Sequence, residues 1–473
     1  MNNKQLTRLG VSGGEPVRTA LEFISRFCRA GNAKSEISAA VEAVLREPAT
    51  FLGDKLRREF AQALLDVPTT FEEADAPWRQ WGTDLESQAV AQMARACRLP
   101  VSVAGALMPD AHLGYGLPIG GVLATDNAVI PYAVGVDIAC RMKLTVLDWP
   151  VSALRERQKE MVRAIECETR FGVGANFKPR RDHEVMDADW SMCGITRAAR
   201  DRAWSQLGTS GSGNHFVEFG VLSVPEDSED SAAAALGSGL PRGEHLALLS
   251  HSGSRGTGAA ICNHYSKLAM ALHPELPPEY RQLAWLSLDS VEGQEYWLAM
   301  ELMGRYAAAN HALIHRHIAS HLGAEVLADV ENHHNFAWKE RHVIGGVERE
   351  VIVHRKGATP AHAGVLGIIP GSMATPGYVV RGRGGEGSLG SASHGAGRAM
   401  SRTRANATFD WATVTPVLQE RNVQLISAGL DEAPMAYKDI HQVMAAQRDL
   451  VEVLGEFTPR LVKMAPSGEQ PED

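Results

Sequence analysis

Glycine constrains the fold of this chain more than any other residue type, because glycine clusters divide the sequence into short segments from about residue 100 onward. Between the clusters stand short apolar runs of the kind that form strands bounded by turns. Longer stretches with helical spacing intervene. We therefore predict a mixed α/β fold with many short strands. The expected strands lie at 121–130, 142–147, 215–222 and 246–250, and the expected helices at 151–166, 259–272 and 294–322.

The first 75 residues differ from the rest of the chain in their pattern of apolar residues. Three runs there carry apolar residues at three- and four-residue spacing, which predicts amphipathic helices. We expect a helical extension of unknown role over residues 1–75, followed by one large domain over residues 76–473. The three expected helices lie at 16–29, 33–46 and 56–65.

Charge and hydropathy limit the class of protein. The 473 residues carry a formal net charge of −9. This balance argues against a uniformly basic nucleic-acid binder, although a local basic cleft is compatible with it. No stretch approaches the ~18 consecutive apolar residues of a membrane span, and the N-terminus lacks the apolar segment of a signal peptide. Six cysteines are too few for a disulfide framework in a chain of this length. We expect a soluble, cytoplasmic protein that does not bind membranes.

One set of side chains could hold metal ions. Asp137 and Cys140 stand three residues apart at the end of an apolar run, while His215, His251 and His334 each follow a strand-like run or a glycine turn. A carboxylate and a thiolate on one turn can share a divalent cation, and a thiolate can bridge two. The five together would form a ligand set suited to Mn, Zn or Fe. The alternative is a buried thiol near a capping aspartate, with histidines that only form hydrogen bonds.

A second group of histidines has a simpler interpretation. His311, His315, His317 and His321 form two His-x-x-x-His pairs in an expected helix. That spacing places two imidazoles on one helix face, as in some zinc sites. However, no His-Glu-x-x-His sequence is present and the helix is rich in alanine. We predict a solvated or packed helix face here and no metal.

Several glycine-rich segments could bring backbone N–H groups close to an anion. They are GTSGSG at 208–213, IIPGSM at 368–373 and the long stretch 381–398; a loop between strands is the alternative for each. No Gly-Lys pair occurs, which excludes a P-loop. Between residues 376 and 405 only Glu386 is acidic, so this region is suited to phosphate or an RNA backbone, or is a solvated surface. Its basic residues are Arg381, Arg383, Arg398, Arg402 and Arg404.

These segments together resemble one family, the RtcB-type RNA-splicing ligases. The similarity is carried by MPDAHLGYG, VGVDIAC, GTSGSGNHFVEF, HSGSRG, ENHHNF and GSASHGAGR, by the segment 355–373 and by DEAPMAYKDI at 431–440. It runs from about residue 76 to residue 463. The resemblance implies the family's mixed α/β fold around a central metal and nucleotide cleft. It also implies an enzyme of tRNA splicing and RNA repair that uses GTP to join RNA 3′-phosphate or 2′,3′-cyclic phosphate ends to 5′-hydroxyl ends. It identifies no particular RNA and no activating protein.

The resemblance also implies roles for individual residues. Two Mn²⁺ ions would be bound by Asp137, Cys140, His215, His251 and His334, with Cys140 bridging. His394 would be the catalytic nucleophile that becomes guanylylated. Arg255 and Asp110 would contact the RNA. Contacts to GTP are implied for Asn214, His215, Phe216, Val217, Glu218, His334, Asn335, Pro370, Gly371, Ser372, Met373, His394, Gly395, Ala396, Gly397, Tyr437 and Lys463.

The chain departs from the family pattern at a few positions. Ala139 and Arg141 stand where glycine is usual beside the metal cysteine, and Gly377 stands where a serine usually contacts guanine. Lys463 matches the family's C-terminal lysine only with a small shift. Residues 1–75 lie outside the similarity. We therefore interpret the chain as a divergent member.

Two other functions remain compatible with parts of this pattern. A metal-dependent phosphoesterase could use the same five ligands, but hydrolysis needs no guanylyl acceptor such as His394. A noncatalytic RNA-binding descendant would have no need to retain both His394 and the full ligand set, whereas the changes at Arg141 and Gly377 agree with it.

Overall fold

The structure is a computed structural model that describes residues 5–6, 9, 11, 15–66, 71–225 and 240–468. Within these ranges the protein is a mixed α/β protein built on two sheets, which confirms the predicted fold class. Parts of the two expected domains lie outside the described residues, at 1–4, 7–8, 10, 12–14, 67–70, 226–239 and 469–473.

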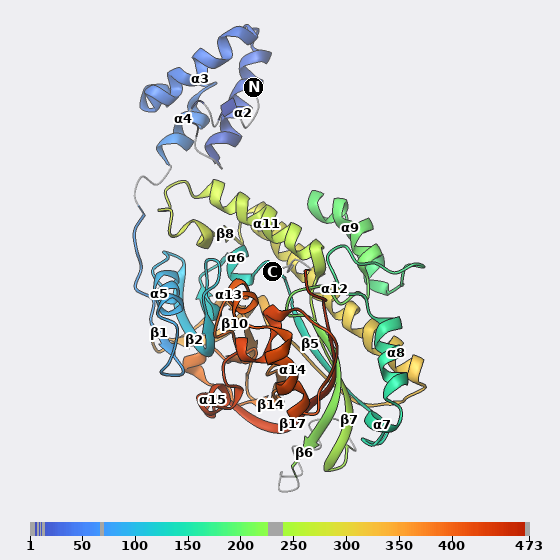
Figure 1. The fold of residues 1–473 in the computed structure, drawn as a ribbon. Helices are drawn as coiled ribbons and strands as arrows, with labels where there is room; N and C mark the ends of the chain where they lie inside the picture. Colours follow the sequence, from blue (N-terminus) through green and yellow to red (C-terminus); the bar gives the residue numbers. More distant parts are fainter. Residues whose placement is uncertain are drawn as a thin grey trace.

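Three helices of the N-terminal extension pack around a core of their own (Figure 1). Phe23 stacks on Phe60 with ring centroids 6.0 Å apart, and Phe27 tilts against Phe23 at 5.5 Å. Phe23 and Phe27 reach the same core because residues four apart share a helix face. A cleft of about 550 Å³ lies between the extension and residues beside the end of α11 (Arg255–Leu272). The three helices are α2 (Glu15–Arg29), α3 (Ile37–Arg46) and α4 (Arg58–Leu65).

A five-stranded sheet forms one half of the main body, in the order β1-β2-β3-β11-β10. Its strands pair antiparallel except for β1 and β2, which run parallel. Helix α5 (Ser87–Ala96) packs beside it and buries Ala89 and Met93. The strands are β1 (Trp78–Gln80), β2 (Ser102–His112), β3 (Ile119–Thr125), β10 (Asn335–Ile344) and β11 (Val347–Lys356).

An eight-stranded sheet forms the other half, in the order β13-β14-β17-β6-β7-β5-β9, with β16 paired to β17. Only the pairing of β16 with β17 is parallel among the described strands of this sheet. The last strand of the sequence, β17, therefore lies inside the sheet. The strands are β5 (Arg141–Leu147), β6 (Phe216–Val224), β7 (Gly243–Ser252), β9 (Val326–His333), β13 (Leu366–Ile369), β14 (Gly377–Gly382), β16 (Gln424–Ser427) and β17 (Val451–Met464).

The larger sheet is buried on both faces. On β7, Leu246 and Leu248 belong to one apolar cluster, whereas Ala247 and Leu249 belong to another on the opposite face. A continuous apolar run of this kind is typical of a strand that is covered on both sides. The first cluster includes Met161 from α8 (Gln158–Glu168).

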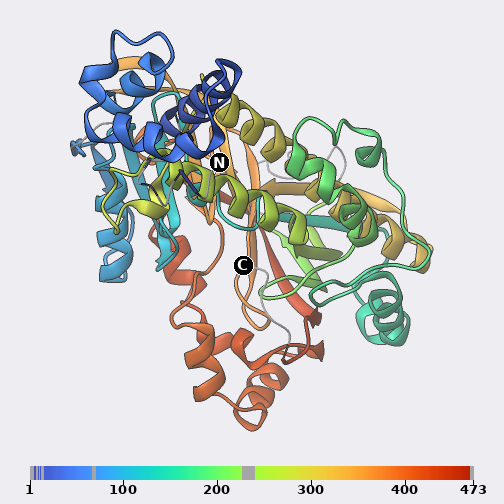
Figure 2. The same ribbon diagram turned by 90° about the horizontal axis from the view of Figure 1, so that it is seen from above.

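The 32-residue helix α12 (Val291–Leu322) packs against the face of the larger sheet that carries Leu246 and Leu248 (Figures 1 and 2). It begins where the Ser290 Oγ accepts a hydrogen bond of 3.0 Å from the Gly293 amide, and it ends at Gly323, whose φ is +64°. A serine cap and a left-handed glycine are common signals for the two ends of a helix. Ile314 and Ile318 of this helix join the cluster that contains Leu248.

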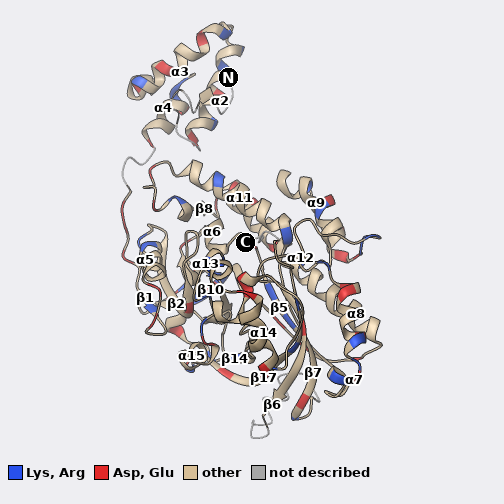
Figure 3. Ribbon diagram, in the orientation of Figure 1, with Lys and Arg blue, Asp and Glu red and all other residues tan. Residues whose placement is uncertain are grey.

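Shorter elements connect the two sheets and cover their edges. No helix within the described ranges is long and apolar enough to cross a lipid bilayer. Acidic and basic residues are interspersed over the outer helices (Figure 3). The shorter elements are α6 (Pro131–Val134), α7 (Ala153–Glu156), α9 (Gly194–Gln206), α13 (Arg402–Thr408), α14 (Trp411–Glu420), α15 (Ile440–Ala445), β4 (Ala128–Val129), β8 (Leu286–Ser287), β12 (Ala358–Pro360) and β15 (Ser391–Ser393).

Candidate functional site

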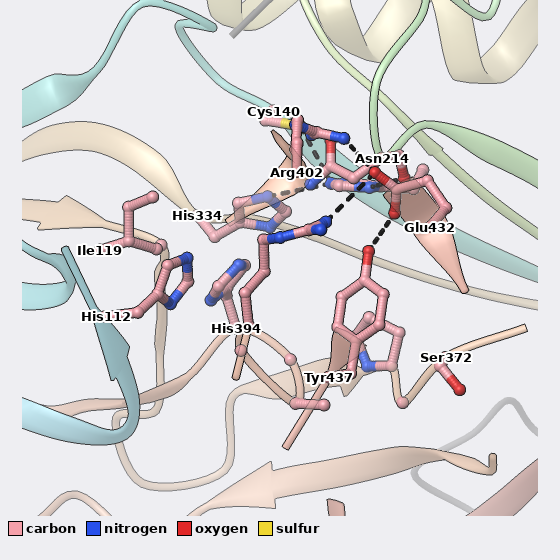
Figure 4. A pocket seen from close by; sticks show the side chains of 18 of the residues that line it. His112, Ile119, Cys140, Asn214, His334, Ser372, His394, Arg402, Glu432 and Tyr437 are labelled. Carbon is pink, nitrogen blue, oxygen red and sulfur yellow. Dashed lines mark hydrogen bonds and ion pairs between the residues drawn. The ribbon is translucent and has the colours of Figure 1, made fainter. Parts of the chain in front are cut away.

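A cavity of about 780 Å³ lies where the two sheets meet. His334 marks this junction, because it stands between β9 of the larger sheet and β10 of the smaller one. His251 enters from β7, Cys140 from the turn before β5, and His394 from the turn after β15. Strands that are far apart in the sequence therefore bring their polar ends to one cavity (Figure 4).

The five residues expected to bind metal form one compact, buried cluster. The Cys140 Sγ lies 3.3 Å from the His215 Nε2 and 3.0 Å from the His251 Nε2. The His251 Nε2 lies 3.2 Å from the His334 Nε2, and the His215 Nε2 lies 3.0 Å from the nearer Asp137 oxygen. Two groups of three potential ligands result, and Cys140 belongs to both. This is the arrangement required for a thiolate that bridges two cations.

The chemistry of this cluster fits metal ions better than hydrogen bonds alone. The His251 Nδ1 donates to the Asn214 carbonyl at 3.1 Å, so the His251 Nε2 presents a lone pair to the cluster. Burial lowers the pKa of His251 to about 3 and holds the pKa of His334 well below its usual range. Both imidazoles are therefore neutral near pH 7, as metal ligands must be. Burial opposes ionisation of Asp137, but the neighbouring His215 and Arg255 outweigh it and lower the pKa of that carboxyl.

The turn that carries Cys140 requires an unusual backbone. Ala139 has a φ of +57°, in the left-handed region that disfavours any residue with a Cβ. Its amide donates to the Asn335 carbonyl at 2.6 Å, and the His334 amide donates to the Cys140 carbonyl at 3.0 Å. These bonds tie the two ligand-bearing segments together, and the positive φ of Ala139 explains why glycine suits this position. The nearby Arg141 points its charge to Glu331, 3.0 Å away, and does not line the cavity.

His394 is held in one orientation beside the metal cluster. Its Nδ1 donates to an Asp110 carboxylate oxygen at 2.7 Å, and the amides of His394 and Gly395 donate to the same oxygen at 3.1 and 3.3 Å. The ring centroid lies 5.0 Å from that of His334. Gly397 is required here, because its φ is +72° and a Cβ would overlap the Asp110 carbonyl. The Nε2 of His394 is therefore the nitrogen available for chemistry.

The remaining cavity wall contains most of the residues expected to contact GTP. Glu218 is buried in this wall, and desolvation raises its pKa well above its usual range. The Tyr437 hydroxyl donates to Glu432. Of the residues expected to contact GTP, the cavity is lined by Asn214, Phe216, Glu218, His334, Asn335, Pro370, Gly371, Ser372, Met373, His394, Gly395, Ala396, Gly397 and Tyr437.

Several expected contacts lie elsewhere. His215 faces the metal cluster behind the cavity wall. Val217 and Lys463 are paired across β6 and β17 and do not line the cavity, whereas Val462 on the other face of β17 does. The Lys463 ammonium lies 5.7 Å from the Phe171 ring centroid, away from the expected nucleotide.

The two side chains expected to contact RNA are fully buried in this structure. Asp110 lies behind His394, and Arg255 donates to the His215 Nδ1 at 3.0 Å. Gly211 makes room for Arg255, because a Cβ there would overlap the guanidinium. The segment 208–213 thus accommodates an arginine and is not part of the cavity wall. Asp110 and Arg255 are placed to orient the two histidines.

The sequence pattern gives no site role to Glu432, which lines the cavity beside Arg402 of the basic stretch. Glu432 is buried and forms an ion pair with Arg402 and another with Arg398, whose Nη1 is 3.3 Å away. Glu432 lies about thirty residues after Arg398 and Arg402 in the sequence, so the composition of the basic stretch alone does not indicate this pairing. Of the five arginines in that stretch, the cavity wall includes Arg398, Arg402 and Arg404.

Two of the helix histidines support the site from behind. The Ser250 Oγ lies 2.7 Å from the His311 Nδ1 and 2.7 Å from the His315 Nε2, and all three residues are buried. Ser250 precedes His251, so these bonds anchor the strand that carries a potential metal ligand. This agrees with the packed helix face predicted for His311 and His315.

We expect acid to destabilise the protein through these histidines. Burial lowers the pKa of His311 and His315 well below the usual value of about 6.5. As the pH falls below about 6.5, the unfolded chain binds protons that the folded chain excludes. The free energy of unfolding should be highest above this pH and should fall by about 1.4 kcal/mol per pH unit for each histidine. Urea unfolding in chelator should show this slope, and a His311→Gln, His315→Gln variant should reduce it. An equal slope in both proteins would contradict the assignment.

Comparison with known proteins agrees with this geometry. The model of the family described as tRNA-splicing ligase RtcB matches residues 92–193 and 185–464. The RNA-splicing ligase RtcB of Escherichia coli K12 is 33% identical over 413 residues, which cover 80% of this chain and 95% of the relative. The tRNA-splicing ligase RtcB of Methanococcus maripaludis is 32% identical, covering 81% and 92%. The RNA-splicing ligase RtcB homolog 1 of Entamoeba histolytica is 30% identical, covering 76% and 79%. This chain belongs to the RtcB family.

Proposed function

We propose that this protein is an RNA ligase that joins 3′-phosphate or 2′,3′-cyclic phosphate ends to 5′-hydroxyl ends, using GTP and two Mn²⁺ ions through a histidine–GMP intermediate. Its substrates would be cleaved RNAs such as those of tRNA splicing and RNA repair. Family membership supports the ligase activity. The observation that carries the proposal is the position of His394, oriented by Asp110 and adjacent to a cluster that shares one thiolate.

The residues of the site fit the first chemical step. Asp110 fixes the proton of His394 on Nδ1, so the Nε2 lone pair can attack the α-phosphorus of GTP. A P–N bond forms, the P–O bond to pyrophosphate breaks, and the pyrophosphate oxygen leaves with the electron pair. Asp137, Cys140, His215, His251 and His334 would hold the two Mn²⁺ ions, which supply charge neutralisation at the phosphoryl oxygens.

In the second step the same nitrogen is the leaving group, and in the third step GMP leaves. An oxygen of the RNA 3′-phosphate attacks the phosphorus of the adduct and breaks its P–N bond to His394; a 2′,3′-cyclic phosphate must first be opened by water. The 5′-hydroxyl oxygen then attacks the RNA phosphorus, loses its proton and releases GMP. Arg398 and Arg402 line the cavity and supply fixed positive charge for these anions. The phosphoesterase alternative leaves the three hydrogen bonds that hold His394 to Asp110 without a purpose, so we favour transfer over hydrolysis.

Covalent labelling tests the proposed function. The protein is incubated with GTP labelled at the α-phosphate and with Mn²⁺, and is then separated under denaturing conditions. We expect label on the protein with α-labelled GTP and none with γ-labelled GTP, because pyrophosphate leaves. Sealing of an RNA pair with 3′-phosphate and 5′-hydroxyl ends should follow. A protein that hydrolyses the RNA phosphate without forming an adduct would support the phosphoesterase instead.

Base selection should be weaker than in members with a serine at the position of Gly377. Gly377 lines the cavity, and the missing hydroxyl removes a hydrogen bond worth on the order of 1 kcal/mol, or about fivefold in selectivity. We expect Gly377→Ser to raise the preference for GTP over ATP by about this factor. Gly377→Ala is the matched control, because its Cβ would also meet the Pro370 Cα at 3.2 Å but brings no hydroxyl. Adduct yields with GTP and ATP measure the ratio; a strict GTP preference in the unaltered protein would contradict the expectation.

A further inference from the structure

A second cluster of potential metal ligands lies on the five-stranded sheet, outside the cavity. It consists of Glu340 and His342 on β10 and of His362 in the loop that follows β12. The His342 Nε2 lies 2.7 Å from a Glu340 oxygen, and the His362 Nε2 lies 3.2 Å from the same oxygen. None of the three residues lines the catalytic cavity.

The backbone explains why these atoms converge. Glu340 and His342 are two residues apart on one strand, so their side chains leave the same face of the sheet. His362 reaches them from a loop whose backbone is fixed by a hydrogen bond of 2.6 Å from the Ala361 amide to the Gly390 carbonyl. The imidazole planes of His342 and His362 are inclined by only 31°, with centroids 5.8 Å apart. Both Nε2 atoms therefore face one carboxylate oxygen.

The spacing matches that of the catalytic cluster in the same protein. Neighbouring ligand atoms there are 3.0–3.3 Å apart, compared with 2.7 and 3.2 Å around Glu340.

Each cluster also contacts a buried arginine. Arg355 is fully buried and contacts both Glu340 oxygens, at 2.6 and 3.0 Å, which fixes the carboxylate plane. Such a partner orients a ligating carboxylate in metal sites.

Exposure distinguishes the two clusters. The side chain of His362 is 40% exposed, whereas those of Glu340 and His342 are 12% and 10% exposed. The exposed side leaves room for water to complete the coordination sphere around two imidazoles and one carboxylate. Two histidines with one glutamate form a common three-residue ligand set for Zn²⁺.

We propose that Glu340, His342 and His362 bind one divalent transition-metal ion, for which Zn²⁺ is the probe. The ion joins β10 to the loop that leads into β13 (Leu366–Ile369). That strand is followed directly by Pro370, which lines the catalytic cavity. The ion therefore links β10 to the segment that precedes this part of the cavity wall, and it takes no part in the transfer chemistry.

Metal titration in a variant that lacks the catalytic cluster tests the site. The full chain, free of affinity tags, carries Cys140→Ala and His251→Ala, and is titrated with Zn²⁺ against a chromophoric chelator. We expect one equivalent of bound Zn²⁺. Adding His342→Ala should abolish it, Glu340→Gln should weaken it at least about tenfold, and His264→Ala, an exposed histidine in α11, should leave it unchanged.

Thermal unfolding gives a second measurement. Zn²⁺ should raise the unfolding temperature of the background variant and should have no such effect once His362 is replaced by Asn. His362→Asn removes a partly exposed side chain, so it remains informative if His342→Ala fails to fold. A background variant that binds no Zn²⁺, or that keeps its equivalent after His362→Asn, would overturn the proposal. Neither result depends on the guanylylation assay.

Discussion

His394→Ala should form no covalent guanylate, with a loss of at least about a thousandfold in adduct yield, because the attacking nitrogen is removed. The variant should still seal RNA that is supplied with a guanylylated 3′ end, since the metal cluster required for that step is unchanged. Labelled GTP measures the first step, and sealing of the activated RNA measures the second. The expected contrast between these two results separates a nucleophile from a residue that merely supports the fold.

The chemistry of the adduct provides an independent check on His394. A phosphoramidate is labile in acid and survives alkali, which is the reverse of a serine phosphate ester.

Asp110→Asn is the matched variant, because the amide can donate to Nδ1 and favour the wrong tautomer of His394. In a comparable pair, a change of this kind lowers the rate by about 10⁴. If His394→Ala still forms the labelled adduct, the nucleophile lies elsewhere, and His112 or His333 would be the next to replace.

Cys140→Ala should remove bound manganese and abolish guanylylation while the fold persists. The thiolate belongs to both groups of ligands, so its loss weakens the binding of both ions. We expect the affinity for Mn²⁺ to fall by more than about a hundredfold. Elemental analysis of the purified variant measures the metal, and its unfolding temperature in chelator verifies the fold. Ser254→Ala is a useful control, because its hydroxyl also contacts Asp137 but offers no thiolate. Full metal occupancy in Cys140→Ala would refute the bridging role.

Metal binding should also weaken in acid. The His251 and His334 imidazoles already have low pKa values in the metal-free fold, because burial disfavours their protonated forms. The proton of the Cys140 thiol must still leave when the metal binds. Apparent affinity should therefore fall as protons compete for the thiolate, and Mn²⁺ titrations at successive pH values measure the decline. A pH-independent affinity would mean that the thiolate is not a ligand.

The sequence predicts several strands and helices and the residues that form the buried cluster of potential ligands, although the expected strand 121–130 and helix 151–166 are each divided in two. The run 142–147 lies within β5, 246–250 within β7 and 259–272 within α11, because their apolar patterns are continuous or strongly periodic. Asp137 and His251 belong to two groups of potential ligands, and Cys140 is shared by both groups, as expected for one site. The resemblance to a known family supplied His394, which periodicity alone would not single out.

The parts that the sequence did not predict depend on strand register and on distant pairing. Lys463 stands beside cavity-lining neighbours, yet alternation along β17 directs its side chain to the opposite face. The resemblance implies RNA contacts for Arg255 and Asp110, and the structure adds that each is buried and hydrogen-bonded to a histidine. The partner of Arg402 became evident only when folding brought Glu432 beside it. These contacts form between segments that are distant in the sequence, so the pattern within one segment does not predict them.

The interior position of β17 sets the order in which the molecule can be assembled during synthesis. The core of the N-terminal extension is complete within its first 66 residues and can form early. The larger sheet cannot close until Val451–Met464 has been made, because that strand joins β14 to β6. Strands β6 and β14 therefore have unpaired edges until β17 has been synthesised. A chain that ended shortly before Val451 would contain all five expected metal ligands but would lack the strand that completes the sheet.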